Sequence, residues 1–432
     1  MSDMAVRVES ISDRTSGGAN RPRLNEIPVA DLTLDFQFGG SDAHGPVEAT
    51  LRVIPGPRLE GHLPPWELAL PLSKGLLAGA VAKCQGVWWS KVVEHNGLGY
   101  TFHRNAQKAM TPEDFHSNVL PHIAEAGDQL YVQIFRPKHP RYAATSEYGG
   151  WLRHILLKQT DPLRILIRSE SFMAPWNLLY LGDPSAPDSD CFLGAKHVVE
   201  HDVSDSLPAP AEMARPERVA LHLDENIDAA TETKRFGAVQ DFISLLRRNR
   251  VQWVNRNNKA AFLSELRRGV PESAFYVLCH GTSGSDVRPD SDDTKLYLTR
   301  TPQTLDEGIT PSDIDSSLDR VGALQGQPVV FLNACRALKT GSSYYRGFVS
   351  SFLNADARAV IGPEIEMPTI FAREFARLFF ERWYGGGPNR TIGLVLLELR
   401  REFLHEHGNP LGLTYSLYRG SGHYLPASSA LV

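Results

Sequence analysis

The sequence has few cysteines and no long apolar segment, and each absence excludes a class of protein. Four cysteines occur in 432 residues, at positions 84, 191, 279 and 335, too few and too dispersed for a disulfide framework. No CxxC motif is present, so the cysteine spacing does not fit a zinc site. No segment approaches the roughly 20 apolar residues that span a bilayer, and the N-terminus lacks a signal-like apolar run. We therefore expect a cytoplasmic protein with reduced thiols, no metal and no membrane contact.

Composition and charge exclude further classes. Hydrophobic residues make up 42% of the chain and charged residues 22%, as is typical of a soluble globular protein. The net charge of −5 provides no overall attraction for nucleic acid. Neither a GxxxxGK[ST] loop nor a strand-linked GxGxxG motif occurs, which argues against a nucleotide-binding regulator. We expect neither a nucleic-acid partner nor a cofactor.

The chain divides by composition into five segments. Residues 1–25 are polar and predict a flexible tail. Residues 26–124 predict a small N-terminal region that is β-rich or α+β, in which LTLDFQF and EATLRVI alternate as half-buried strands do and Thr111 precedes a helix. Residues 125–205 contain the apolar run QLYVQIF, a helical stretch around WLRHILLKQ and the strand LRILIRS. A segment rich in Pro and Ala at 206–217 predicts a linker to the last region, 218–432.

The last region alternates strands with amphipathic helices, which predicts an α/β fold with a mostly parallel sheet flanked by helices. We expect strands at 218–224, 275–279, 329–332 and 358–362, and helices at 233–249, 371–384 and 391–407. Functional groups in such sheets gather just beyond the carboxyl ends of the strands.

A histidine and a cysteine follow two of these strands. His280 comes directly after FYVLC, and Cys335 comes shortly after VVFL. An imidazole close to a thiol generates a nucleophilic thiolate and then protonates a leaving amine, so the two predict a catalytic dyad. The backbone N–H groups of Gly281 and Cys335 are candidates for an oxyanion hole. A cysteine ending a buried strand is otherwise a small core residue, which is how we interpret Cys279.

The two blocks FYVLCHGTSGSD and PVVFLNACRA resemble the catalytic blocks of bacterial CHAT-domain peptidases, relatives of caspases, metacaspases and separase. The stretches LRILIRSESFMAPWNLLYL, AVIGPEIEMP and NPLGLTYSLYRG extend the resemblance over about residues 125–425. It implies that Cys335 is the nucleophile, His280 the general acid/base and Gly281 an oxyanion contact. It also implies a caspase-like sheet with a degenerate, dyad-free half at 125–205. Where many members carry a Trp and an Asp pair, this sequence reads Gly-Pro-Glu-Ile-Glu.

Acidic residues beside the predicted dyad suggest a preference for basic substrates. Glu364 and Glu366 follow the strand at 358–362, and a carboxylate in the substrate pocket favours Arg or Lys. Related proteases place an acidic residue near this block, and Glu364 is the preferred candidate. The alternative is a solvated loop carboxylate. Asp286, in the loop after His280, is a further substrate-binding candidate, in a segment that is either a lid, an acidic steering surface or an ordinary exposed loop.

Two functions of different class follow. The first is a cysteine endopeptidase that cleaves a protein partner after Arg or Lys through a thioester acyl-enzyme. Similar bacterial proteases serve in defence under an upstream activator and act on a gasdermin-like or other effector, which is an implication of the resemblance. The second is a catalytically silent caspase-like scaffold that binds protein partners. Retention of both His280 and Cys335 favours the peptidase.

Overall fold

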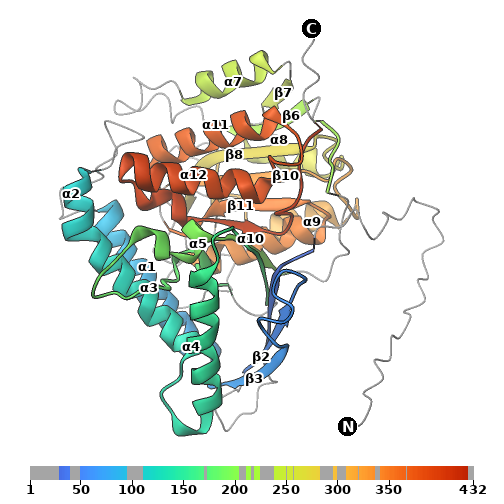
Figure 1. Cartoon of the computed structure of the whole chain (residues 1–432). Helices are drawn as coiled ribbons and strands as arrows, with labels where there is room; N and C mark the ends of the chain where they lie inside the picture. The colour runs from blue at the N-terminus through green and yellow to red at the C-terminus, as the bar shows by residue number, and fades with distance from the viewer. Residues whose placement is uncertain are drawn as a thin grey trace, which may run out of the picture.

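A computed structural model describes residues 29–38, 49–94, 110–169, 173–203, 211–215, 218–223, 238–249, 251–255, 257–282, 295–298, 308–319, 321–335, 341–365 and 367–426. Within these residues, helices pack around one large sheet (Figure 1). The strands are β1 (Leu32–Phe38), β2 (Ala49–Pro55), β3 (Trp66–Leu70), β4 (Arg164–Arg168), β5 (Val198–Asp202), β6 (Arg218–Leu223), β7 (Gln252–Asn255), β8 (Ala274–Thr282), β9 (Lys295–Tyr297), β10 (Val329–Cys335), β11 (Ala359–Pro363) and β12 (Tyr415–Tyr418). The helices are α1 (Lys74–Trp88), α2 (Pro112–Asp114), α3 (Leu120–Phe135), α4 (Ala143–Lys158), α5 (Leu193–Lys196), α7 (Ala238–Arg248), α8 (Lys259–Leu266), α9 (Pro311–Leu318), α10 (Gly341–Asn354), α11 (Thr369–Gly385) and α12 (Ile392–His407).

The sheet is mostly parallel. Its strand order is β3-β2-β1-β4-β5-β12-β11-β10-β8-β6-β7, and β9 pairs with β8 off this path. Among the described strands, β1–β2, β2–β3, β11–β12 and β8–β9 are antiparallel, and the other pairings are parallel. The predicted α/β class with a mostly parallel sheet flanked by helices is therefore confirmed.

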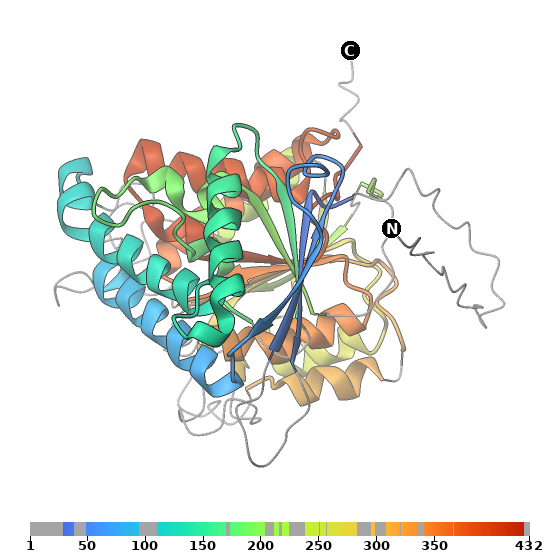
Figure 2. The same cartoon turned by 60° about the horizontal axis from the view of Figure 1, so that its bottom comes forward.

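Apolar side chains cover both faces of the sheet, because successive residues of a strand point to opposite sides. Phe275 packs against Phe262 of α8 and Phe352 of α10 on one face. On the other face, Tyr276 packs against Phe242 of α7 and Phe380 of α11. Figure 2 shows the orange helix α10 and the red helix α12 on opposite sides of the strands. The strands are thus fixed from both sides.

The N-terminal region extends the same sheet. The two predicted strands are present as β1 and β2, which pair antiparallel, while β1 pairs parallel with β4. Thr111 caps the next helix by accepting a hydrogen bond from the N–H of Asp114, as predicted. The apolar run QLYVQIF is the last part of α3. The domain boundaries stay predictions, but strands from all three large segments share one sheet.

The predicted tail, residues 1–25, lies outside the described residues. Of the predicted linker at 206–217, residues 211–215 are described and pack on the C-terminal region. The guanidinium of Arg215 donates hydrogen bonds to the carbonyl oxygens of Tyr384, at 2.9 Å, and of Pro426, at 2.8 Å. This part of the linker is therefore held against the fold. None of the helices in the described part of the chain is long and apolar enough to cross a membrane.

Strand β12 and a buried glutamate join the two halves of the sheet. β12 lies between β5 and β11, parallel to the first and antiparallel to the second. Glu200 of β5 is buried and forms an ion pair with Arg164 of β4, 2.9 Å from Oε2 to Nη2. Its Oε1 accepts a hydrogen bond from the N–H of Gly420, at 2.8 Å, and the hydroxyl of Ser421 donates to Oε2. Glu200 therefore ties β4 and β5 to the chain just beyond β12.

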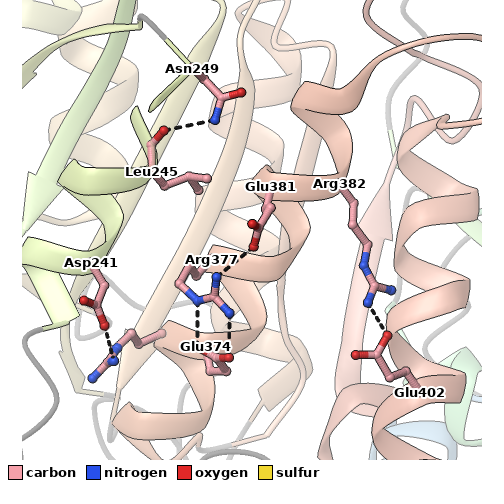
Figure 3. A network of polar contacts seen from close by, with 9 residues as sticks. Asp241, Leu245, Asn249, Glu374, Arg377, Glu381, Arg382 and Glu402 are labelled. Atoms are coloured by element: carbon pink, nitrogen blue, oxygen red, sulfur yellow. Dashed lines mark hydrogen bonds and ion pairs between the residues drawn. The ribbon is translucent and has the colours of Figure 1, made fainter. Parts of the chain in front are cut away.

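Ion pairs link α7 to α11 and α11 to α12 (Figure 3). Asp241 of α7 accepts from Arg373 of α11, at 2.6 Å. Arg382 of α11 pairs with Glu402 of α12. The side chains of Arg373, Arg382 and Glu402 are 11%, 23% and 23% exposed, so these pairs are partly buried. They supplement the aromatic packing between α7 and α11, where Phe242 contacts Phe380.

Candidate functional site

Strands β8 and β10 bring the two predicted catalytic residues together. These strands pair in parallel, and the pairing runs from Val329 with Ala274 to Cys335 with His280. Neighbouring strands lie about 4.8 Å apart, so the backbones of Cys335 and His280 are adjacent at one edge of the sheet. The side chains of both residues lie outside the described part of the structure, and the dyad stays a prediction.

Both strands are longer than predicted. His280 and Gly281 belong to β8, and Cys335 is the last residue of β10, whereas the sequence placed all three beyond the strand ends. The extension of β8 has a physical reason, because β9 pairs with residues 280–282 on an antiparallel ladder in which His280 faces Tyr297 and Gly281 faces Leu296. His280 therefore has a backbone partner on each side. The oxyanion role of Gly281 stays a prediction.

The other three cysteines have the properties of structural thiols. Cys279 is fully buried in the core on the α8–α10 face, as predicted. Burial raises the pKa of Cys84 to about 12 and also raises the pKa of Cys191, which is partly exposed. A raised thiol pKa lowers the thiolate fraction at neutral pH. Among the described residues, no group of three His, Cys, Asp or Glu side chains is placed to hold a metal ion.

Glu364 lies directly after β11, at the same edge of the sheet as the end of β10. Its side chain is 1% exposed, so the alternative of a solvated loop carboxylate is wrong for this residue. The hydroxyl of Tyr418 donates to Oε1, and the side-chain amide of Gln85 in α1 donates to the Glu364 carbonyl oxygen, at 3.0 Å. Burial raises the pKa of the carboxyl to about 7, against the lowering effect of the Tyr418 and Ser416 hydroxyls.

Glu364 forms no ion pair with a Lys or Arg among the described residues, so no described positive charge balances its carboxylate. The site thus has a desolvated carboxyl that is not paired with a cation among the described residues. Glu366 and Asp286, the other two candidates for substrate binding, lie outside the described residues.

Known proteins resemble this chain only at the level of structure. No protein-family model matches it, and no curated protein sequence matches it. Two crystal structures of the Saccharomyces cerevisiae separase–securin complex are similar to it, with 10% identity and a TM-score of 0.43, and with 12% identity and a TM-score of 0.44. Each alignment covers 91% of this chain and 30% of the separase chain. The chain therefore spans less than a third of the length of these separase chains, and the values do not assign it to a family.

Two buried polar residues near the end of β10 were not identified from the sequence. Asn333 precedes Cys335 by two positions in β10 and is fully buried, and Tyr415 opens β12. The hydroxyl of Tyr415 donates to Oδ1 of Asn333, at 2.6 Å. The available signal was an asparagine within the otherwise apolar strand VVFLNAC, because a buried amide needs hydrogen-bond partners.

Proposed function

We propose that the chain is a caspase-like cysteine endopeptidase that cleaves a protein partner after Arg or Lys. The observation that carries the proposal is the register of β8 and β10, in which Cys335 and His280 are direct backbone partners at the carboxyl ends of parallel strands. Adjacent thiol and imidazole groups at such an edge suit acyl transfer. The raised thiol pKa values of Cys84 and Cys191 support Cys335 as the nucleophile.

In this mechanism, the Cys335 thiolate attacks the carbonyl carbon of the scissile peptide bond. The N–H groups of Gly281 and Cys335 donate to the oxyanion that forms. The C–N bond then breaks while the His280 imidazolium gives its proton to the leaving amine, which leaves a thioester on Cys335. A water molecule that transfers a proton to His280 attacks the thioester carbon and releases the carboxylate product and the thiolate.

Glu364 is the proposed partner of the basic substrate residue. A buried carboxyl without a cation gains a charge-assisted contact when Arg or Lys arrives, whereas a carboxyl that is already paired gains little. The carboxyl is 1% exposed, so binding there requires displacement of the atoms that cover it. The natural partner is proposed to be a protein, including an effector of the gasdermin type in a bacterial defence system.

The first experiment tests the dyad. Wild type, Cys335→Ala and His280→Ala are incubated with a mixed peptide library, and new N-termini are identified by mass spectrometry. We expect cleavage by wild type and none by either variant. Cys191→Ala is the matched control, since it removes a partly exposed thiol far from β10 in the sequence and should keep full activity. Cleavage that survives Cys335→Ala would falsify the assignment, and a wild type that binds partners without cutting them would favour the scaffold.

The second experiment tests Glu364. A charge-assisted hydrogen bond contributes roughly 1.5–3 kcal/mol, so Glu364→Gln should lower kcat/KM for Arg and Lys substrates by about 10- to 100-fold. Substrates with a neutral residue at the same position should be much less affected. In wild type, the ratio of basic to neutral cleavage should rise as the pH passes through about 7, where the carboxyl ionises. Glu381→Gln on α11 serves as the control, and an unchanged profile for Glu364→Gln removes this residue from the substrate pocket.

A further inference from the structure

Asn333 has all of its amide groups engaged although it sits inside an apolar strand. Its Nδ2 donates to the carbonyl oxygen of Ala372 in α11, at 2.6 Å, and to the hydroxyl of Tyr276 in β8, at 3.3 Å. Its Oδ1 accepts from the Tyr415 hydroxyl of β12, at 2.6 Å. A fully buried amide with three partners on three elements has one low-energy position, because each unmade hydrogen bond would leave a desolvated polar atom.

Tyr415 is held as firmly as Asn333. Its ring stacks on Phe375 of α11, with the ring centroids 4.1 Å apart. Its carbonyl oxygen accepts two hydrogen bonds, from Nη2 of the fully buried Arg400 in α12, at 2.6 Å, and from Nδ2 of Asn177, at 3.0 Å. Its backbone partner in β11 is Pro363, the residue before Glu364. These contacts fix the position of the Tyr415 hydroxyl, whose hydrogen bond links β12 to Asn333 of β10.

The end of β10 needs such support. The ladder between β10 and β11 stops at Phe331 with Ile361, whereas the ladder between β10 and β8 continues to Cys335. From Leu332 to Cys335, β10 is therefore paired with β8 and not with β11. The hydrogen bonds of Asn333 to α11 and β12 lie within this segment, two residues from Cys335.

We infer that Asn333 and Tyr415 form a positioning pair, which sets the end of β10 against β8 and thereby places Cys335 relative to His280. The inference rests on the proposed peptidase function. Neither residue takes part in making or breaking a bond or in transferring a proton. The pair acts through the strand, and its loss should misplace the nucleophile by a fraction of an ångström to an ångström, a displacement that costs an enzyme up to about 100-fold in rate.

Tyr415→Phe tests the inference with the smallest possible change, because it removes the hydroxyl and keeps the ring on Phe375. Tyr384→Phe is the matched control, since the Tyr384 hydroxyl is equally buried but has no hydrogen-bond partner among the described residues. Two readouts are taken. Peptide cleavage gives kcat and KM, and the rate of iodoacetamide alkylation of Cys335 against pH, followed by peptide mass spectrometry, gives the reactivity of the thiol without any substrate.

We expect Tyr415→Phe to lower kcat by about 10- to 100-fold with little change in KM. The alkylation profile of Cys335 should shift to higher pH as its thiolate loses the placed imidazole. Tyr384→Phe should match wild type in both readouts. Asn333→Ala should reproduce the effect, and the double variant should be no worse than the more affected single variant, because both changes disable one unit.

Three results would overturn the inference. Folded Tyr415→Phe and Asn333→Ala proteins with wild-type kcat and alkylation profiles would overturn it and leave the peptidase proposal standing. Lost activity that coincides with a lost folded state, seen in circular dichroism and thermal unfolding, would assign the pair to stability alone. A wild-type Cys335 that reacts no faster than an ordinary thiol and a protein that cleaves nothing would overturn the proposed function together with this inference.

Discussion

Two buried glutamates border β12, and they differ in what surrounds the carboxyl. Glu200, in β5, receives the guanidinium of Arg164, the hydroxyl of Ser421 and the N–H of Gly420. Burial raises its pKa, but these partners together outweigh burial and hold the pKa below its ordinary value. Glu364, after β11, has hydroxyl neighbours and no described cation, and burial raises its pKa to about 7.

The comparison separates a structural carboxylate from one with capacity for a ligand. A charge taken out of water stabilises the fold only when its partners are complete. Glu200 meets this condition within the chain. Glu364 does not meet it with the described residues, so its ionised form is costly unless a further cation binds. That difference is the physical basis for the proposal that Glu364, and not Glu200, binds the substrate.

The largest loss of stability should come from removing the charge of Glu200, whose hydrogen-bond and ion-pair partners are complete. Glu200→Gln leaves Arg164 without its anion in a largely buried place, and we expect a loss of about 3 kcal/mol in the free energy of unfolding at pH 7. Because the folded-state pKa of Glu200 is lowered, its contribution is present above the ordinary pKa of a glutamate and is lost as the pH falls. Urea denaturation at pH 7 and pH 4 measures this. Glu398→Gln, an exposed position on α12, should change little, and an equal loss in both variants would contradict the role of Glu200.

A change of opposite sign is expected at Glu364. Its folded-state pKa is raised, so the stability that it contributes is present below its unfolded pKa and is lost as the pH rises through about 7. Glu364→Gln should therefore match wild type near pH 4 and be more stable at pH 8, by at most about 3 kcal/mol. Urea denaturation at the two pH values checks this expectation. A stabilised variant that cleaves poorly after Arg would show that the wild type gives up stability for binding, while an equal effect at both pH values would mean that Glu364 does not titrate in this range.

The smallest effect should come from an exposed pair of the same chemistry. The side chains of Arg52 in β2 and Glu67 in β3 are 48% and 61% exposed and form an ion pair, 3.0 Å from Nε to Oε2. Glu67→Gln should cost about 0.5 kcal/mol or less, because water and salt screen an exposed pair. The free energies of unfolding of wild type and variant should converge as the ionic strength rises, which urea denaturation at low and high salt measures. A loss of unfolding free energy as large as that of Glu200→Gln would show that exposure does not determine how much these carboxylates stabilise the fold.

The sequence predicted the proximity of His280 and Cys335, since polar residues that follow parallel apolar strands meet at one edge. It did not predict that both residues lie in paired strands, because β9 extends β8 through a contact that local patterns do not contain. The burial of Glu364 was equally out of reach, as it depends on Tyr418, 54 residues later, and on Gln85, 279 residues earlier.

Strand β12 was not predicted either. Its four residues are too short to give a periodic signal, and its place between β5 and β11 is a property of the whole sheet. The role of Tyr415, which lies in this strand, consequently could not be predicted from the sequence. The fold class followed from local alternation, but the strand order required the structure.

The place of β12 also has a consequence for biosynthesis. It is the last of the described strands in chain order, yet it lies between β5 and β11, which are made earlier. On a ribosome, the neighbouring edges of β5 and β11 stay without this partner until residue 418 has emerged. The nascent chain therefore carries two incomplete sheets with open edges, which are prone to wrong pairing. Since Tyr415 arrives with β12, Asn333 of β10 receives the hydrogen bond from the Tyr415 hydroxyl only when nearly all of the described chain has been synthesised. This delays completion of the sheet edge that carries His280 and Cys335.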